Sequence, residues 1–360
     1  MWRTVWNKLK VWFRDWYDKK ISMLLIWTGC TFLLGFSAPW WLSPILPIMN
    51  EALNFNIAIP DDTVEVIPLV LKGIFSFGLI AIGIWYRFRI KTKSKKMLQI
   101  RHSSVEVVNF NDIHADLDDY EVVPITINLH QDLAKIDHFQ LKMAWKNQEH
   151  AVSELLVHIH DPSTKEVAYM GMAHIPFQFL LGYQLADKSS IDFYEWNRNE
   201  LAWKPVIEKN HQYPELVLLK DESKQSAPDV EEIIIKVGIT FEIFDSQLEG
   251  LGIDHLNSYY FKLEPPRVDA ITCVQQLNQY KHQFRTLLTD VHHRYRGLKK
   301  VHIFFSAQPS VAFKFGSTIS PRMDSNKEFW IYNYVGSSQI KYPWALKLSK
   351  EMKDEAIKIV

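Results

Sequence analysis

The sequence predicts an α/β protein: an N-terminal transmembrane helical hairpin followed by two Rossmann-like units in tandem. Three observations lead to this fold class. Two long apolar segments lie in the first hundred residues, a strand–turn–helix–strand pattern then occurs twice, and the zero net charge of the 360-residue chain is unevenly distributed. Residues 1–100 carry 13 basic and 6 acidic side chains, giving +7, whereas residues 101–360 carry 28 and 35, giving −7.

The composition excludes several classes of protein. Hydrophobic residues make up 47% of the chain, which argues against wholesale disorder. A balanced net charge argues against a protein that coats nucleic acid by neutralising many phosphates. The two cysteines, Cys30 and Cys273, exclude a disulfide framework or a cysteine-rich zinc site, and they fit a reducing compartment.

The hairpin is predicted from residues 21–90. Residues 21–38 are apolar, and no charged residue occurs between Lys20 and Glu51. A second apolar segment, 66–86, is interrupted only by Lys72. A membrane-spanning helix needs about 20 such residues, so both segments are long enough. Lysines and arginines flank the pair on both outer sides and are absent from the connection between the spans, which predicts cytoplasmic N- and C-termini.

Alternatives remain open around this hairpin. Residues 1–20 have apolar side chains at helical spacing, typical of an amphipathic interfacial helix, although they also fit a simple extension of the first span. A cleaved signal peptide is disfavoured because its apolar region is only about 7–15 residues long. Gly73, Gly78 and Gly83 are explained either by a helix–helix contact or by the general tolerance of membrane helices for glycine.

The remaining sequence divides at polar stretches. Residues 91–121 are expected to form a charged linker, 122–220 the first α/β half, 230–345 the second half and 346–360 a C-terminal tail. The first half shows strands at 122–130, 167–176 and 191–196, with a helix that follows the turn at 131–132 and reaches about residue 151, and a second helix at 177–182. The second shows strands at 233–244, 301–309 and 329–334, with helices at 268–296 and 310–316. This order predicts parallel strands joined by crossover helices, in two units related by a pseudo-two-fold axis.

Open α/β sheets bind ligands beyond the carboxyl ends of their strands. We therefore expect the ligand at the turns that follow the predicted strands, together with aromatic side chains nearby, although core packing is the commoner role of strand aromatics. The candidate ligand-binding residues are His130, Gln131, Ala173, His174, Phe177, Trp196, Asp245, Ser246, Ser306, Ala307, Gln308 and Phe315.

Two segments resemble a known family. The run AYMGMAHIPFQFLLGYQL at 168–185, with IDFYEWNR at 191–198, resembles the first half of a SAVED domain; VHIFFSAQPSVAFKFGSTI at 301–319, with IYNY at 331–334, resembles its second half. SAVED domains are fused CARF-like folds that sense cyclic oligonucleotides in CBASS antiphage defence. The resemblance implies a cyclic di- or trinucleotide as activating ligand, made by a CD-NTase-type nucleotidyltransferase. It also implies a ligand-induced homo-oligomer that disrupts the bacterial inner membrane, an abortive-infection effector without a cofactor.

Other signals are weaker. Residues 267–300 carry seven basic side chains, which form either a phosphate-binding patch or an ordinary solvated helix face. His158 and His160 alternate on an expected strand, and without a third ligand in sight they do not make a metal site. Because no G-x-S-x-G, Walker or H-E-x-x-H motif occurs, we expect no catalytic residues and no enzyme activity. The alternatives are a membrane-anchored hydrolase or nuclease, or a membrane-tethered protein scaffold.

Overall fold

The computed structural model describes residues 20–31, 66–92, 95–105, 109–111, 113, 120–186, 188–209, 212–227, 230–349 and 353–360. The chain divides into two compact units. The first comprises residues 1–95 and 118–121, and the second comprises residues 96–117 and 122–360. The expected interfacial helix, apart from Lys20, lies outside the described residues, as do residues 32–65.

In the first unit, the helical residues 20–31 pack antiparallel against helix α3 (Val66–Thr92). A Cβ atom on Gly29 would lie 2.9 Å from the carbonyl oxygen of Ser76, and one on Gly83 would lie 3.1 Å from that of Ser22. A Cβ atom on Gly78 would meet nothing within 4 Å. The helix–helix contact therefore explains Gly83, whereas Gly78 lies away from it.

The outer surface of this helix pair is apolar. Its exposed large side chains are Met23, Leu24, Trp27, Ile74, Phe75, Phe77, Ile82, Ile84, Trp85 and Phe88. Within the described residues, no helix combines the length and the apolar character needed to cross a membrane. Only residues 21–31 of the first predicted span belong to the described part of the chain.

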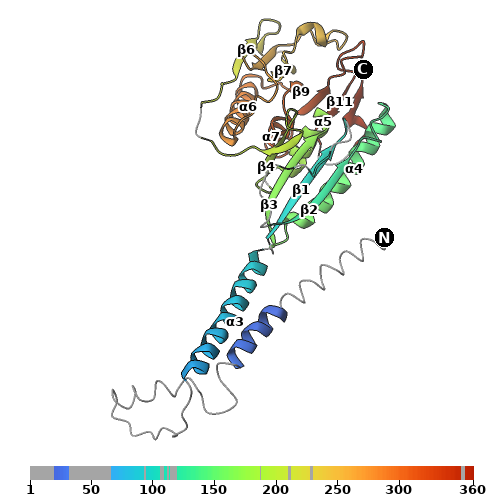
Figure 1. Ribbon diagram of the computed structural model, residues 1–360. Helices are drawn as coiled ribbons and strands as arrows, with labels where there is room; N and C mark the ends of the chain where they lie inside the picture. Colours follow the sequence, from blue (N-terminus) through green and yellow to red (C-terminus); the bar gives the residue numbers. More distant parts are fainter. Residues whose placement is uncertain are drawn as a thin grey trace. The chain divides into compact units, whose positions relative to one another are not determined.

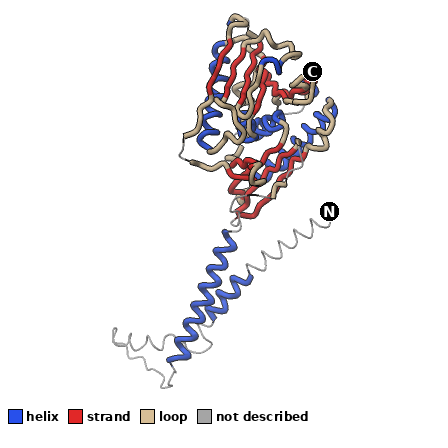
Figure 2. The backbone as a smooth tube through the Cα atoms, turned by 45° about the horizontal axis from the view of Figure 1, so that its top comes forward, coloured by secondary structure: helices blue, strands red, loops and turns tan. Residues whose placement is uncertain are grey.

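The second unit contains two sheets, seen as two groups of arrows in Figure 1 and of red segments in Figure 2. The first sheet has the order β2-β1-β3-β4-β5, and the second has the order β12-β11-β10-β9-β7-β8-β6. The strands of the first sheet are β1 (Lys95–Ser103), β2 (Tyr120–Asn128), β3 (Thr164–Met172), β4 (Asp192–Asn197) and β5 (Ala202–Pro205). Those of the second are β6 (Val217–Asp221), β7 (Glu232–Gly238), β8 (Ser258–Lys262), β9 (Lys300–Ser306), β10 (Glu328–Asn333), β11 (Trp344–Lys347) and β12 (Ile357–Ile359).

The expected duplication is present. Strand β1 pairs parallel with β3, β3 pairs parallel with β4, and β4 pairs antiparallel with β5. Strands β7, β9, β10 and β11 repeat this pattern in the second sheet. The strand equivalent to β7 is thus β1, which lies inside the expected linker 91–121, and not the predicted strand at 122–130. The buried run Met97–Ile100 is flanked by lysines, arginine and histidine, which hid its strand pattern.

The boundaries of other elements also differ from the prediction. Strand β7 ends at Gly238 rather than at residue 244, because the chain turns there. Strand β12 lies within the expected C-terminal tail and pairs antiparallel with β11. The tail also contacts the first half, since Lys142 Nζ lies 2.5 Å from Asp354 Oδ1. Residues 346–360 are therefore an integral part of the fold.

Two short helices, α5 (Ile175–Leu185) and α7 (Pro309–Gly316), join the halves and lie between the sheets (Figure 1). Each follows a strand of one sheet and contacts the other: α5 contacts β10 and β11, and α7 contacts β3 and β4. The longer helices α4 (His138–Ile159) and α6 (Val274–Arg294) are the crossovers of the two halves. One continuous hydrophobic core therefore includes residues of both sheets.

Reciprocal glycines hold α5 against α7. A Cβ atom on Gly182 would lie 2.0 Å from the carbonyl oxygen of Phe313, and one on Gly316 would lie 2.1 Å from that of Phe179. The aromatic contacts of the two helices are also reciprocal. Phe313 of α7 packs on Tyr169 of β3 at 4.6 Å, and Phe179 of α5 packs on Phe305 of β9 at 4.9 Å. The expected pseudo-two-fold axis therefore passes between α5 and α7.

We predict that Gly316→Ala destabilises the chain by about 3 kcal/mol or prevents folding, because the added Cβ atom would overlap backbone atoms that cannot move aside cheaply. Urea unfolding followed by tryptophan fluorescence measures the change. Gly336→Ala is the matched control, since its Cβ atom would meet only side-chain atoms at 3.5 Å or more. Equal unfolding midpoints for the two variants would contradict the close contact.

Candidate functional site

The carboxyl edges of the two sheets come together at the starts of α5 and α7. Trp344 lies opposite Asn333 at the end of β10, and its ring is 5.9 Å from the ring of His174, the N-cap of α5. On the other side, the Ser310 N–H at the start of α7 donates to Glu195 Oε1 of β4 at 3.0 Å. We call this surface the joined edge; it comprises residues 103–105, 129–131, 173–174, 239–241, 263–272 and 306–308.

The start of α5 carries neutral polar groups. The backbone N–H of His174 donates to Ser104 Oγ at 2.7 Å, and the Nδ1 atom of His174 lies 2.7 Å from the same oxygen. Burial, and to a smaller extent the nearby His130, lower the pKa of His174 to about 4. Burial also lowers the pKa of His102, at the end of β1, to about 3. Near pH 7 the imidazoles of His102 and His174 therefore act as neutral hydrogen-bonding groups.

The start of α7 is organised by hydrogen bonds to neighbouring loops. Gln308, its N-cap, accepts the N–H of Ile271 at Oε1 at 2.7 Å. The carbonyl oxygen of Ser306 accepts the N–H groups of Ile239 and Thr240. Ser306 and Gln308 thus position the segments that follow β7 and β8.

Glu195 reaches this helix start from the other half. Burial raises the pKa of its carboxyl to about 7; hydrogen bonds from Ser310 oppose that change, and the neighbouring Asp269 adds to it. Asp269 has a φ of +55°, so the loop after β8 takes a left-handed turn beside this carboxyl. The α7 end of the joined edge therefore carries two acidic groups.

The structure brings together seven of the twelve predicted residues. His130 and Gln131 follow β2, whose end is held beside β1 by the Leu129 N–H bonding to the Ser103 carbonyl oxygen. Ala173 and His174 follow β3, and Ser306, Ala307 and Gln308 follow β9. These positions agree with the rule that parallel strands present their following turns on one edge.

The other five lie elsewhere or are packed. Phe177 and Phe315 are fully buried, against Trp344 at 6.1 Å and Phe284 at 4.4 Å. Trp196 packs edge-to-face on Trp203 at 5.4 Å. These three aromatic rings serve packing, the commoner role of such residues.

Asp245 and Ser246 belong to a segment over the outer face of the second sheet. Asp245, in the turn η2 (Asp245–Leu248), pairs with Lys236 Nζ of β7 at 2.7 Å. Apolar residues of this segment form a second small core on that face with Phe304 and Tyr332. Because residues 233–244 were expected to form one strand, Asp245 and Ser246 were expected at its carboxyl end. Strand β7 ends at Gly238 instead, so the two residues lie beyond that end, over the outer face of the sheet.

Sequence reasoning missed exposed apolar side chains that follow three strands. Val105 follows β1, Phe241 follows β7 and Val268 follows β8, and each is more than a third exposed. Tyr334, one of the strand aromatics considered from the sequence, follows β10 and is also exposed. A large apolar residue just beyond the carboxyl end of a strand was the available signal. For Phe241, the expected strand 233–244 obscured it.

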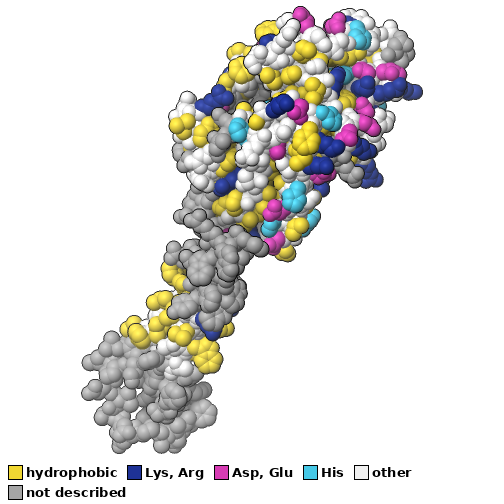
Figure 3. All heavy atoms as spheres, turned by 90° about the vertical axis from the view of Figure 1, so that its right-hand side faces the viewer, with side chains coloured by type: hydrophobic (Ala, Val, Ile, Leu, Met, Phe, Trp, Pro, Cys, Tyr) yellow, Lys and Arg dark blue, Asp and Glu magenta, His cyan; other side chains and the backbone are white. Residues whose placement is uncertain are grey.

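The basic stretch 267–300 does not form an open cationic patch, because four of its seven cations have carboxylate partners. Arg285 pairs with the buried Asp324 at 2.8 Å, and Arg294 pairs with Glu222 at 2.9 Å. Lys299 and Lys300 pair with Glu231 and Glu232. Acidic and basic side chains likewise alternate over the face of the second unit in Figure 3.

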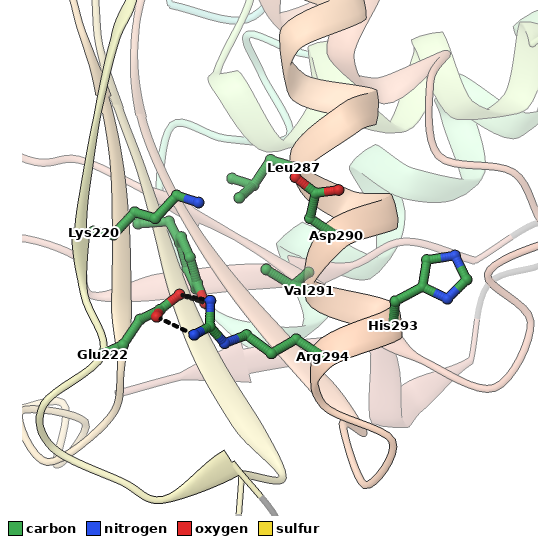
Figure 4. A pocket seen from close by; sticks show the side chains of 8 residues that line it. Lys220, Glu222, Leu287, Asp290, Val291, His293 and Arg294 are labelled. Atoms are coloured by element: carbon green, nitrogen blue, oxygen red, sulfur yellow. Dashed lines mark hydrogen bonds and ion pairs between the residues drawn. The ribbon is translucent and has the colours of Figure 1, made fainter.

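A hollow of about 410 Å³ contains one of these pairs (Figure 4). It lies between β6, β8 and the end of α6, with Arg294 and Glu222 joined across it. Glu222 directly follows β6, and Asp221 of that strand pairs with Ser258 at the start of β8. The hollow is therefore at the amino ends of the parallel strands, away from the joined edge.

Within the described part of the chain, no three His, Cys, Asp or Glu side chains are grouped so that they could hold a metal ion. His158 and His160 lie at the end of α4, with His160 as its C-cap, and not on a strand as expected.

Comparison with known proteins supports this description. Residues 152–348, more than half of the chain, match the family model described as "SMODS-associated and fused to various effectors sensor domain", or SAVED. A search of curated proteins found no match.

Solved structures with a similar fold include the Cap4 SAVED/CARF-domain containing receptor of Acinetobacter baumannii. Its complex with the cyclic trinucleotide 3′3′3′-cAAA is 15% identical with a TM-score of 0.47, covering 85% of this chain and 65% of that chain. Its complex with 2′3′3′-cAAA is 13% identical with a TM-score of 0.45, covering 87% and 66%. The Cap4 receptor of Moraxella osloensis is 13% identical with a TM-score of 0.42, covering 85% and 63%. The chain thus spans slightly less than two thirds of each Cap4 structure.

We predict that replacing Glu195 by glutamine changes the pH dependence of stability. The carboxyl has a pKa of about 7 in the folded chain and about 4.3 when unfolded. Between these values the folded state binds more protons, so this group makes stability fall as pH rises from about 5 to about 7.5. Glu195→Gln should therefore gain stability relative to wild type over that range.

Urea midpoints at several pH values measure the difference. The exposed Glu154 of α4 supplies the control, and Glu154→Gln should follow wild type at every pH. A constant difference between Glu195→Gln and wild type across the range would contradict the raised pKa.

Proposed function

Because the chain belongs to the SAVED family of sensor domains, we propose that its second unit binds a cyclic oligonucleotide second messenger at the joined edge. The observation that carries this proposal is the contact between α5 and α7. It places the carboxyl edges of two Rossmann-like halves beside one another, where such sheets take ligands.

The groups at the joined edge suit a small anionic ligand with bases. The start of α5 lies on this surface, and the positive end of a helix dipole attracts phosphate. His174, held in place by Ser104, adds a neutral hydrogen-bonding group, and the exposed ring of Phe241 is suited to stacking on bases. Most cations of the basic stretch are already paired, which favours a small cyclic molecule over a polymer.

The second part of the proposal concerns the output. We infer that the chain is a non-enzymatic CBASS effector in the bacterial inner membrane, with both termini in the cytoplasm. Ligand binding would assemble several copies, and the apolar segments 21–38 and 66–86 would then disrupt the membrane. The distribution of basic residues around these segments and the apolar surface of the helix pair support this. A nucleotidyltransferase of the CD-NTase type would supply the ligand.

We predict that the full-length chain in detergent micelles binds a cyclic trinucleotide such as 3′3′3′-cAAA, or a cyclic dinucleotide, in isothermal titration calorimetry. The linear trinucleotide should bind more weakly, because it loses freedom on ordering that the ring has already lost. Ser104→Ala and His174→Ala should each weaken binding by about tenfold, the value of one hydrogen bond to a charged group.

Ser153→Ala is the matched control, since Ser153 lies on an exposed part of α4 and bonds only within its helix. The absence of heat with every member of a panel of cyclic di- and trinucleotides would refute the sensing proposal. Stoichiometric zinc or manganese in the purified protein would instead favour the hydrolase or nuclease alternative.

We predict that deletion of residues 1–90 abolishes ligand-dependent toxicity in cells and leaves ligand binding intact, because β1 and the whole second unit remain. Growth and uptake of a membrane-impermeant dye, with the nucleotidyltransferase co-expressed, measure the effect. The full chain carrying His174→Ala serves as a ligand-deficient comparison. Toxicity that survives the deletion would contradict the membrane step.

A further inference from the structure

The two halves of the joined edge have the same backbone plan and different charges. His174 and Gln308 are equivalent as N-caps of α5 and α7, and the reciprocal glycines Gly182 and Gly316 each follow their N-cap by eight positions. A ligand lying across the axis therefore meets two similar helix starts. They differ in one backbone donor and in the side chains around them: the second residue after the N-cap is Ser310 in α7 and Pro176, which has no N–H, in α5.

At the start of α7, a carboxylate already receives the backbone donor. Glu195 lies in β4 opposite Lys204 of β5, and its Oε1 atom accepts the Ser310 N–H at 3.0 Å. This is the position in which a helix start ordinarily receives an anion. Glu195 belongs to the first half, whereas α7 belongs to the second, so this hydrogen bond joins the two halves.

Among the described residues, no carboxylate accepts a hydrogen bond from the start of α5. The first turn of α5 contains no acidic residue, and its N-cap makes no side-chain cap. The groups described there are His174, Ser104 and the nearby His130. An anion placed at this end meets hydroxyl and imidazole groups, and one placed at the α7 end meets the carboxylates of Glu195 and Asp269.

We propose that Glu195 is a specificity-determining residue of the ligand site, whose carboxylate occupies the anion position at the start of α7 and so keeps the ligand's phosphates away from that helix start. This inference rests on the proposed function. Its consequence is selection by charge, because a cyclic trinucleotide carries three phosphates around its ring and a cyclic dinucleotide two. The more phosphates the ring carries, the more of them must approach the α7 end.

Protonation should relieve the repulsion. With its pKa of about 7, the Glu195 carboxyl is mostly neutral near pH 6 and mostly charged near pH 8. The other titratable and charged groups facing it are Asp269 on the loop after β8, Tyr169 on β3 and Lys204 on β5, whose ammonium group pairs with Glu200. At the α5 end lie His130 and His174, and Arg267 is part of the same loop as Asp269.

The test uses the full-length chain in detergent micelles, titrated with 3′3′3′-cAAA and with 3′3′-cyclic di-AMP near pH 6 and near pH 8. Glu195→Gln keeps an oxygen that can accept the Ser310 N–H and removes the charge. Near pH 8 it should tighten trinucleotide binding by about tenfold and dinucleotide binding by less. Near pH 6 the variant and wild type should bind alike. Asp269→Asn, at an exposed position, should act in the same direction more weakly.

If Glu195→Gln fails to fold, the wild-type protein still tests the inference. The affinity of wild type for the trinucleotide should fall from pH 6 to pH 8. The same fall should persist in His130→Gln, which removes one of the two histidines at the α5 end. Binding that is equal for wild type and Glu195→Gln near pH 8, or independent of pH in wild type, would overturn the role of Glu195 and leave the sensing proposal standing. No binding of either ligand to either protein would overturn both.

Discussion

The close contact between α5 and α7 is the constraint on which the second unit depends. At Gly182 and Gly316 the two backbones approach so closely that no side chain fits between them. Because each helix starts at the carboxyl end of its own sheet and packs on the other sheet, this contact fixes the separation and the relative direction of the two edges. A larger residue at either glycine would move one edge relative to the other. The geometry of the joined edge is therefore set by Gly182 and Gly316, which are not part of that surface.

Much of this arrangement was predictable from local sequence signals. Helices α5 and α7 each begin with a proline in the first turn and contain a glycine at the contact, and both follow an apolar strand, so their starts were expected at one edge. That reasoning placed His174 and Gln308 correctly. It also identified the repeat, because the spacing of apolar residues and the positions of proline and glycine can be read from short segments of the sequence.

The remainder depends on partners that lie far away in the sequence. Strand β1 is flanked by charged residues, and only its pairing with β3 makes it a strand of the sheet. The cations at 267–300 looked available until Asp324 and Glu222, which come from other segments, were seen to neutralise two of them. In the same way, the role of Glu195 at α7 follows from a contact across 115 positions of the chain. The spacing of apolar residues along the chain carries no information on contacts between residues that are far apart in the sequence.

The covalent fusion of the two halves has a consequence for how such a site can change. In a symmetric dimer of identical chains, every substitution appears twice, once on each side of the axis. Here a carboxylate stands at the start of one central helix and a histidine–serine pair at the start of the other, each encoded once. A single mutation can therefore alter one side of the joined edge while the other side is inherited unchanged. Duplication within one gene lets the two sides of this surface evolve independently.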